Sequence, residues 1–214
     1  ERSRTWDVMM NKRRHRRLRR RKLQLSPPGA DPGIVLTDPE ALTPLIDLIL
    51  YNEHEFTEDR LSQISLVREH IEGPLAPKQS TIWLNIDGLG EAAMIQEVGD
   101  IFGFHKLALE DVVNVQQRAK LENYKDHQFL VTRIISYHER LESEQLSIFL
   151  GSRYIVTFQE IPGDCFDPVR TRLRAGQTKI REAGPDYLMY SLLDSVIDSY
   201  FPVLEKLGEK METL

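Results

Sequence analysis

The chain has 214 residues, a formal net charge of −5, 41% hydrophobic residues and 29% charged residues. This composition is ordinary for a folded protein, and the acidic balance excludes a chain that binds nucleic acid over its whole surface. A single cysteine, Cys165, excludes an internal disulfide, and the apolar runs are far shorter than the roughly 20 residues of a membrane-spanning helix.

The N-terminal segment is strongly basic. Residues 12–22 read KRRHRRLRRRK, in which nine of the eleven residues are Lys or Arg, and a Pro- and Gly-rich segment, residues 25–33, follows. Like charges at this density repel one another, so we predict a disordered arm and linker over residues 1–30. Such an arm is either a solvated tail or a segment that binds an anionic lipid surface or a nucleic acid.

The folded region is expected to begin near Gly33 with alternating strands and helices. Residues 81–87, TIWLNID, alternate between two faces, and residues 141–160 have the pattern of a hairpin with Gly151 and Ser152 at its turn. Successive hairpins favour a mixed, largely antiparallel sheet sandwiched between helices, which is an α/β fold. The expected strands are 33–38, 45–52 with 55–61 as its partner, 81–87, two within 117–138 and two within 141–160, and the expected helices are 91–103, 104–114 and 168–176.

The C-terminal segment, Pro185–Leu214, has apolar residues at three- and four-residue steps, which is typical of a helix that packs on more than one neighbour. Pro202 lies inside this helix, and because it has no N–H it should remove the hydrogen bond to the carbonyl of Asp198 and bend the helix there. No stop signal follows. We therefore expect the helix to be cut in mid-course and the chain to be part of a longer protein, as its start at Glu1 also suggests.

The residues favour no enzyme, because no histidine pair has zinc-protease spacing and no serine lies in a nucleophile-elbow motif. Four carboxylates are more informative. Glu110 and Asp111 are adjacent, and Asp194 and Asp198 are four apart, on one face of the expected helix. Hard oxygen ligands suit Mg²⁺ or Ca²⁺, so these side chains are candidate metal ligands between helices or between subunits. The alternative is that they stay hydrated or pair with nearby Lys or Arg residues.

Five stretches of the chain, taken together, carry a more specific signal than any single motif. They are WLNIDGL, IFGFHKLALEDVVNVQQRAKLENY, LESEQLSIFLGSRYIVTFQE, GDCFDPVRTRLR and DYLMYSLLDSVIDSYFPVLE. In unbroken order over roughly residues 81–205, they resemble the cytosolic domain of the CorA family of magnesium transporters. One departure is Lys106, where the family usually has proline after the histidine. Another is that the family's two C-terminal membrane helices and its Gly-Met-Asn pore signature are not in this chain.

The resemblance implies a pentameric channel with a cytosolic α/β/α domain, here residues 31–184, followed by a stalk region of which residues 185–214 would be the start. The family senses cytosolic Mg²⁺ at subunit interfaces. Its sensing carboxylates correspond to Glu110, Asp111 and Asp194, with Asp198 as a neighbour. These acids are expected to be unpaired charges in the isolated chain, so that bound Mg²⁺ neutralises them and holds the pentamer closed.

The resemblance also implies Mg²⁺ as the transported ion, with Co²⁺ and other divalent cations as further candidates. It implies a place in the inner membrane, with this domain on the cytoplasmic side, and a monomeric or weakly associated fragment. Anionic lipid is then the expected contact of residues 12–22, and no nucleic acid is expected. Two alternatives stay open: a transporter of zinc or another divalent cation from the same superfamily, and a soluble nucleic-acid-binding module that uses the basic arm.

Overall fold

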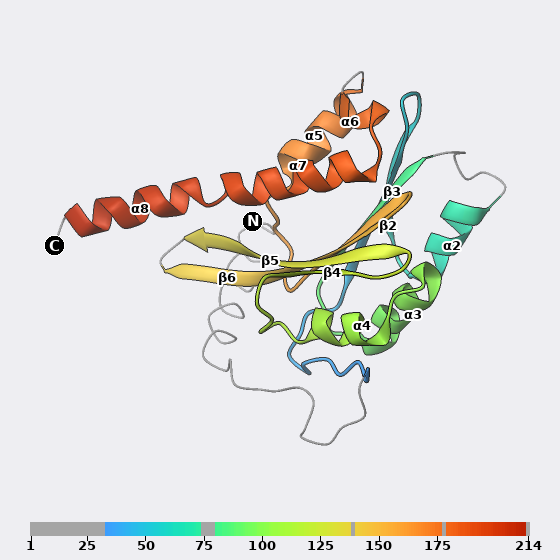
Figure 1. Ribbon diagram of the computed structural model, residues 1–214, viewed down its shortest axis with the longest axis horizontal. Helices are drawn as coiled ribbons and strands as arrows, with labels where there is room; N and C mark the ends of the chain where they lie inside the picture. Colours follow the sequence, from blue (N-terminus) through green and yellow to red (C-terminus); the bar gives the residue numbers. More distant parts are fainter. Residues whose placement is uncertain (1–32, 74–79, 138–139, 177–178, 213–214) are drawn as a thin grey trace, which may run out of the picture. The chain divides into compact units, whose positions relative to one another are not determined.

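The computed structural model describes residues 33–73, 80–137, 140–176 and 179–212 (Figure 1). The basic arm, residues 12–22, and the disorder expected over residues 1–30 lie outside these ranges. The elements in chain order are β1 (Leu45–Tyr51), β2 (Phe56–Leu61), α2 (Ser65–Glu72), β3 (Thr81–Asp87), α3 (Ala92–Phe102), α4 (Lys106–Val113), β4 (Lys120–Asn123), β5 (His127–Tyr137), β6 (Leu141–Gly151), β7 (Tyr154–Gln159), α5 (Asp167–Ala175), α6 (Lys179–Glu182), α7 (Pro185–Asp198) and α8 (Phe201–Glu212).

The described strands form one seven-stranded sheet in the order β2-β1-β3-β7-β6-β5-β4. Every neighbouring pair is antiparallel except β3 and β7, which are parallel. The prediction of a mixed, largely antiparallel sheet is therefore confirmed. The β1–β2 pairing and the β6–β7 hairpin are confirmed with it.

Helices cover both faces of the sheet, and each face has its own hydrophobic core. We name the faces after the helices that carry the candidate carboxylates: α2, α3 and α4 cover the α4 face, and α5, α6 and α7 cover the α7 face (Figure 1). Strand β3 supplies both cores because its side chains alternate, with Leu84 and Ile86 in the α4-face core and Trp83 in the α7-face core. The sandwich predicted from the sequence is thus confirmed, with α4 and α7 on opposite sides of one sheet.

Helices α3 and α4 pack closely because of two glycines. Gly103 ends α3 with a φ of 72°, in the left-handed region that favours glycine. Gly99 faces α4 at such short range that a Cβ placed there would lie 2.3 Å from Cδ1 of Leu109. The helix α4 then begins after His105, whose Nδ1 accepts a hydrogen bond from the backbone N–H of Leu107 at 3.3 Å. These contacts fix the position of the acidic residues on α4.

The expected C-terminal helix is divided in two. α7 ends at Asp198 and α8 begins at Phe201, so the break falls just before Pro202, which cannot donate a hydrogen bond to Asp198. The side chain of Ser199 takes part in the break by donating to the carbonyl of Val196 at 2.6 Å. Pro202 was therefore the correct signal for a disturbance, but its effect is a break between two helices rather than a bend within one.

The expected strand over residues 33–38 is wrong, because residues 34–38 have no regular secondary structure. Val35 is nevertheless 4% exposed and belongs to the α4-face core. Ile34 and Leu36 on either side of it are exposed, so the apolar run buries one side chain of an irregular segment and does not pair in the sheet. The short helices α2 and α6 were not among the elements predicted from the sequence.

Candidate metal site

Glu110 lies in the last turn of α4, on a half-buried part of its surface. Its Oε2 accepts a hydrogen bond from the backbone N–H of Gly33 at 2.9 Å. The carboxylate therefore helps to hold the segment before β1 against α4.

Asp111 does not match the expectation of an unpaired charge. Its Oδ2 lies 2.6 Å from Nζ of Lys120, which also contacts Oε1 of Glu122 at 2.8 Å. Burial of Lys120 opposes its charge, but its hydrogen bonds to Asp111 and Glu122 outweigh this effect and raise its pKa. The same hydrogen bond from Lys120 lowers the pKa of Glu122. A cation that binds Asp111 must therefore compete with an ammonium group already in place.

The second candidate pair lies on α7. Asp194 is half-buried and Asp198 is exposed, and within the described residues neither makes an ion pair or a side-chain hydrogen bond. Asp194 also lies on a row of exposed apolar side chains at helical spacing that continues onto α8. The row consists of Tyr190, Ile197, Phe201, Leu204 and Met211.

The fold does not bring the two pairs together within one chain. Val112 of α4 lies in the core of one face and Val196 of α7 in the core of the other, so the sheet separates the two acidic pairs. Among the residues that the structure describes, no group of three or more His, Cys, Asp or Glu side chains is placed to hold a metal ion. Each pair has the oxygen donors that Mg²⁺ prefers, but each supplies only part of a coordination shell.

A buried polar network, which sequence analysis missed, lies on the α7 face where β3 and β7 end. Oδ1 of Asp87 accepts hydrogen bonds from the amides of Asn85 (3.2 Å) and Gln159 (3.1 Å). Beside them, Asp164 makes a two-pronged ion pair with Arg170 of α5, at 2.6 and 2.5 Å. The sequence did contain a signal for this network. Asn85 and Asp87 share one face of a strand with Trp83, and polar residues on the same face as a buried Trp are expected to be buried too.

Burial, followed by the charge of Asp164, raises the pKa of Asp87 from an ordinary 3.8 to about 7. The hydrogen bond from Asn85 and the charge of Arg170 act in the opposite direction, and Asp47 of β1 adds a smaller like-charge effect. Asp164 also accepts from the backbone N–H of Phe166 at 2.9 Å, at the start of α5. Asp164 is therefore the carboxylate that holds the start of this helix, whereas Asp167, its first residue, is 88% exposed.

Comparison with known proteins identifies relatives of this chain by sequence and by fold. The family described as CorA-like Mg²⁺ transporter protein matches residues 78–214. The cobalt/magnesium transport protein CorA of Thermotoga maritima is 38% identical over 172 residues, which are 79% of this chain and 48% of that protein. The chain thus spans about half the length of this relative.

Two solved structures share the fold at low sequence identity. The soluble domain of CorA from Methanocaldococcus jannaschii matches with a TM-score of 0.56 and 16% identity, over 80% of this chain and 62% of that one. The complete CorA magnesium transporter of the same organism matches with a TM-score of 0.57 and 14% identity, over 78% of this chain and 49% of that one. In the described part of the present chain, no helix has the length and apolar character needed to cross a membrane.

Proposed function

The chain belongs to the CorA family of magnesium transporters, and on that premise we propose that it is the cytosolic regulatory domain of a pentameric Mg²⁺ channel. In this proposal Glu110, Asp111 and Asp194 bind regulatory Mg²⁺ between subunits, with Asp198 beside them. Residues 31–184 form the sensing domain and residues 185–214 lead toward the stalk. The full protein lies in the inner membrane with this domain on the cytoplasmic side.

The observation that carries the proposal is the position of the acidic pairs on opposite faces of one sheet. Val112 and Val196 anchor α4 and α7 in separate cores, so one chain cannot join its own two pairs around an ion. Two chains can, when α4 of one approaches α7 of the next. An arrangement in which each face supplies half of the ligands suits a ring of identical subunits, where every interface is the same.

The charges support a weak and therefore regulatory site. Asp194 is half-buried beside exposed apolar side chains and has no cationic partner among the described residues. Asp111 is held by Lys120, which must be displaced or share the carboxylate before a metal gains it. Competition of this kind lowers affinity toward the millimolar range expected when a site has few protein ligands.

Regulation then follows from charge. Bound Mg²⁺ would supply two positive charges where acidic side chains of neighbouring subunits face each other. The carboxylates attract one another through the ion and repel when it is absent, so the ion favours the closed ring by its greater affinity for that state. A fall in cytosolic Mg²⁺ frees the carboxylates, and their repulsion loosens the interfaces.

Mg²⁺ is proposed as the transported ion as well, and Co²⁺ as a second one, because the Thermotoga maritima relative is named a cobalt/magnesium transport protein. A zinc-transporting relative is the alternative, and ion-uptake measurements on the full protein distinguish the two. Residues 12–22 are proposed to contact anionic lipid headgroups, and nucleic acid is not an expected partner. These residues lie outside the described ranges, so the lipid proposal rests on their charge alone.

Sedimentation velocity of the purified chain tests the interfacial site. Without divalent cations the wild-type chain should sediment as a monomer or weak oligomer, and millimolar MgCl₂ should shift it to larger species, because ligands that bind only an assembled state favour assembly. Asp111→Asn combined with Asp194→Asn should abolish this shift. Asp100→Asn is a matched control, because Asp100 is exposed on α3 and lies in neither acidic pair.

Two results would contradict the proposal. One is that Mg²⁺ leaves the wild-type distribution unchanged. The other is that the double variant and Asp100→Asn respond to Mg²⁺ as the wild type does, which would assign the effect to general screening of the net negative charge. In the full-length channel, the same double variant should weaken closure by Mg²⁺ while conduction remains.

A further inference from the structure

Strand β5 continues beyond its neighbour β4, which pairs with it only as far as Val131. Past that point the outer edge of β5 has no strand beside it among the described residues, and alternate carbonyls along this edge point outward. Two side chains, one from the α7–α8 break and one from α8, bind two of these carbonyls. Oη of Tyr200 donates to the carbonyl of Arg133 at 2.5 Å, and Nζ of Lys206 donates to the carbonyl of Tyr137 at 3.1 Å.

The side chain of Arg133 reaches the α4 face, where it holds the connection between α4 and β4. Its Nη2 donates to the carbonyls of Val115 at 3.0 Å and Gln117 at 3.1 Å. Gln145 is the partner of Arg133 across the β5–β6 pair and contacts the same segment. Its amide accepts from the backbone N–H of Gln117 at 3.1 Å and donates to the carbonyl of Asp111 at 2.8 Å. We call these two side chains, with the backbone groups they bind, the Arg133 clamp.

Arg133 is therefore a single residue with contacts on both sides of the sheet edge. Its carbonyl receives the phenol that anchors α8, and its guanidinium holds the loop that follows the acidic end of α4. Gln145 is 2% exposed, so its hydrogen bonds to Asp111 and Gln117 are made in a buried setting, where a lost partner is costly.

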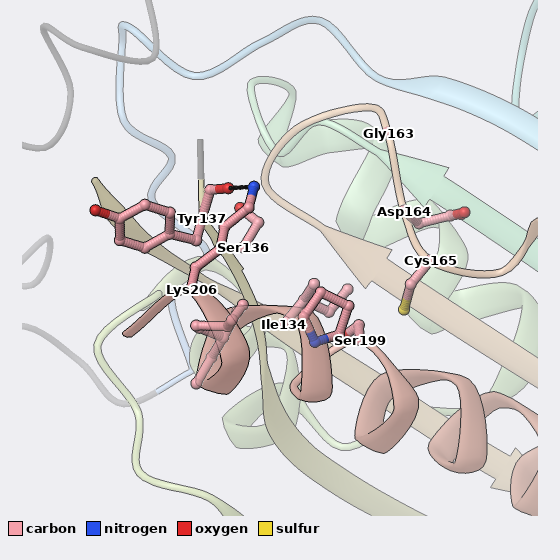
Figure 2. Close-up of a pocket in the computed structure, with 11 residues that line it drawn as sticks. Ile134, Ser136, Tyr137, Gly163, Asp164, Cys165, Ser199 and Lys206 are labelled. Carbon is pink, nitrogen blue, oxygen red and sulfur yellow. Dashed lines mark hydrogen bonds between the residues drawn. The ribbon is translucent and has the colours of Figure 1, made fainter. Parts of the chain in front are cut away.

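A pocket adjoins the contact between α8 and β5. It has a volume of about 260 Å³ and lies where the end of β5, the loop before α5 and the α7–α8 break meet. In Figure 2, Asp164 and Cys165 line one side of it and Tyr137 with Lys206 the other, and Ser199 lies between them. The buried side chain of Val203 and the ammonium groups of Lys206 and Lys210 over the ring of Tyr137 add to the hydrogen bonds that hold α8 to β5.

We propose that Arg133 is a positioning residue that links the acidic end of α4 to the start of α8 through the edge of β5. Because this link would connect the proposed metal-binding carboxylates to α8, the inference rests on the proposed function. A shift of the α4–β4 loop when Asp111 exchanges its partner moves the guanidinium of Arg133, and with it the strand carbonyl that seats Tyr200. Asp194 lies in the last turns of α7, just before the same break, so both acidic pairs bear on the orientation of α8.

Amide hydrogen exchange on the whole chain, without Mg²⁺, tests the link. Tyr200→Phe removes one hydroxyl and should speed exchange in α8 by about fivefold, the factor expected for one lost hydrogen bond. It should also speed exchange across residues 114–119, on the other side of the sheet, by about twofold, because only part of the effect is transmitted. Arg133→Met should do the reverse, with the larger change in residues 114–119 and the smaller one in α8.

Lys206→Met is the matched control. It removes the other tether of α8 to β5, yet Lys206 donates to the carbonyl of Tyr137 and not to that of Arg133, so it should speed exchange in α8 alone. If Tyr200→Phe leaves residues 114–119 unchanged, or if Lys206→Met alters them equally, the link through Arg133 is refuted. Tyr200→Phe is a mild change and decides the question even where Arg133→Met fails to fold.

A parallel series in millimolar MgCl₂ separates this inference from the proposed function. If the wild-type chain binds Mg²⁺ through Asp111, exchange should slow in residues 114–119 and in α8, and Tyr200→Phe should remove the slowing in α8 only. If exchange in the wild-type chain is the same with and without Mg²⁺, the result counts against the metal site. The coupling itself is already settled by the Mg²⁺-free series.

Discussion

Lys120 is a built-in competitor for Asp111, and its removal should strengthen Mg²⁺ binding. Its Nζ lies 2.6 Å from Oδ2 of Asp111 and 2.8 Å from Oε1 of Glu122, and the side chain is 27% exposed. Lys120→Met keeps most of the aliphatic length and deletes the charge. Asp111 then loses its resident cation and faces the like charge of Glu122, so a metal ion meets two carboxylates that lack their shared counter-ion.

The magnitude follows from distance and exposure. Two unit charges about 4 Å apart interact by about 4 kcal/mol at an effective dielectric constant of roughly 20. Partly exposed pairs usually contribute about 1 kcal/mol or less, because water screens them and the side chains lose entropy. Lys120 lies between these limits, so we expect about 1–2 kcal/mol in Mg²⁺ affinity, or about 5- to 30-fold.

Titration calorimetry of the chain with MgCl₂ measures this gain, and Lys125→Met is the matched control. Lys125 is exposed at the turn before β5 and makes no ion pair with Asp111, but its replacement changes the net charge by the same amount. Equal affinities in Lys120→Met and Lys125→Met would show that net charge alone is responsible. Weaker binding in Lys120→Met would refute the reasoning, since it would mean that Lys120 helps to shape the site.

Two further outcomes follow from the buried and the basic residues. Because the folded pKa of Asp87 is about 7 against an ordinary 3.8, the folded state holds a proton that the unfolded state releases, so its contribution to stability should fall between about pH 4 and pH 7. Urea denaturation at pH 5 and pH 8 should show a loss of about 2 kcal/mol in the wild type that is absent from Asp87→Asn, and equal pH dependence in both would contradict it. Residues 12–22, fused to a neutral reporter, should float with anionic but not with neutral liposomes, and equal flotation would retire the lipid contact.

The sequence predicted an element well where the spacing of its apolar residues matches the side chains that are buried in the fold. Residues 81–87 alternate between two cores, and Gly103 ends α3 as expected because only a residue free to adopt a positive φ closes the helix there. Residues 33–38 misled for the opposite reason. Of their apolar side chains only Val35 is buried, and Ile34 and Leu36 are exposed, so the run forms no strand, and the local pattern has no information about which backbone lies beside it.

The candidate carboxylates show a similar division. Their oxygen chemistry could be read from the sequence, but their relative position could not, because it depends on the parallel β3–β7 pair and on which face each connection crosses. The partner of Asp111 was also hidden, since Lys120 lies nine residues away beyond an irregular loop. For the same reason the Arg133 clamp has no motif: it joins a loop, two strands and a helix through backbone carbonyls.

The outer strand β2 has a consequence for how copies of this domain can meet. It presents Glu58, Asp59 and Arg60 in succession, and Arg174 of α5 holds Glu58 through two hydrogen bonds of 2.7 and 2.6 Å. Charged side chains and a helix clamped across an edge strand discourage a second sheet from adding to it. A domain guarded in this way is protected from open-ended β-polymerisation at that edge, even when many copies are crowded beside one another.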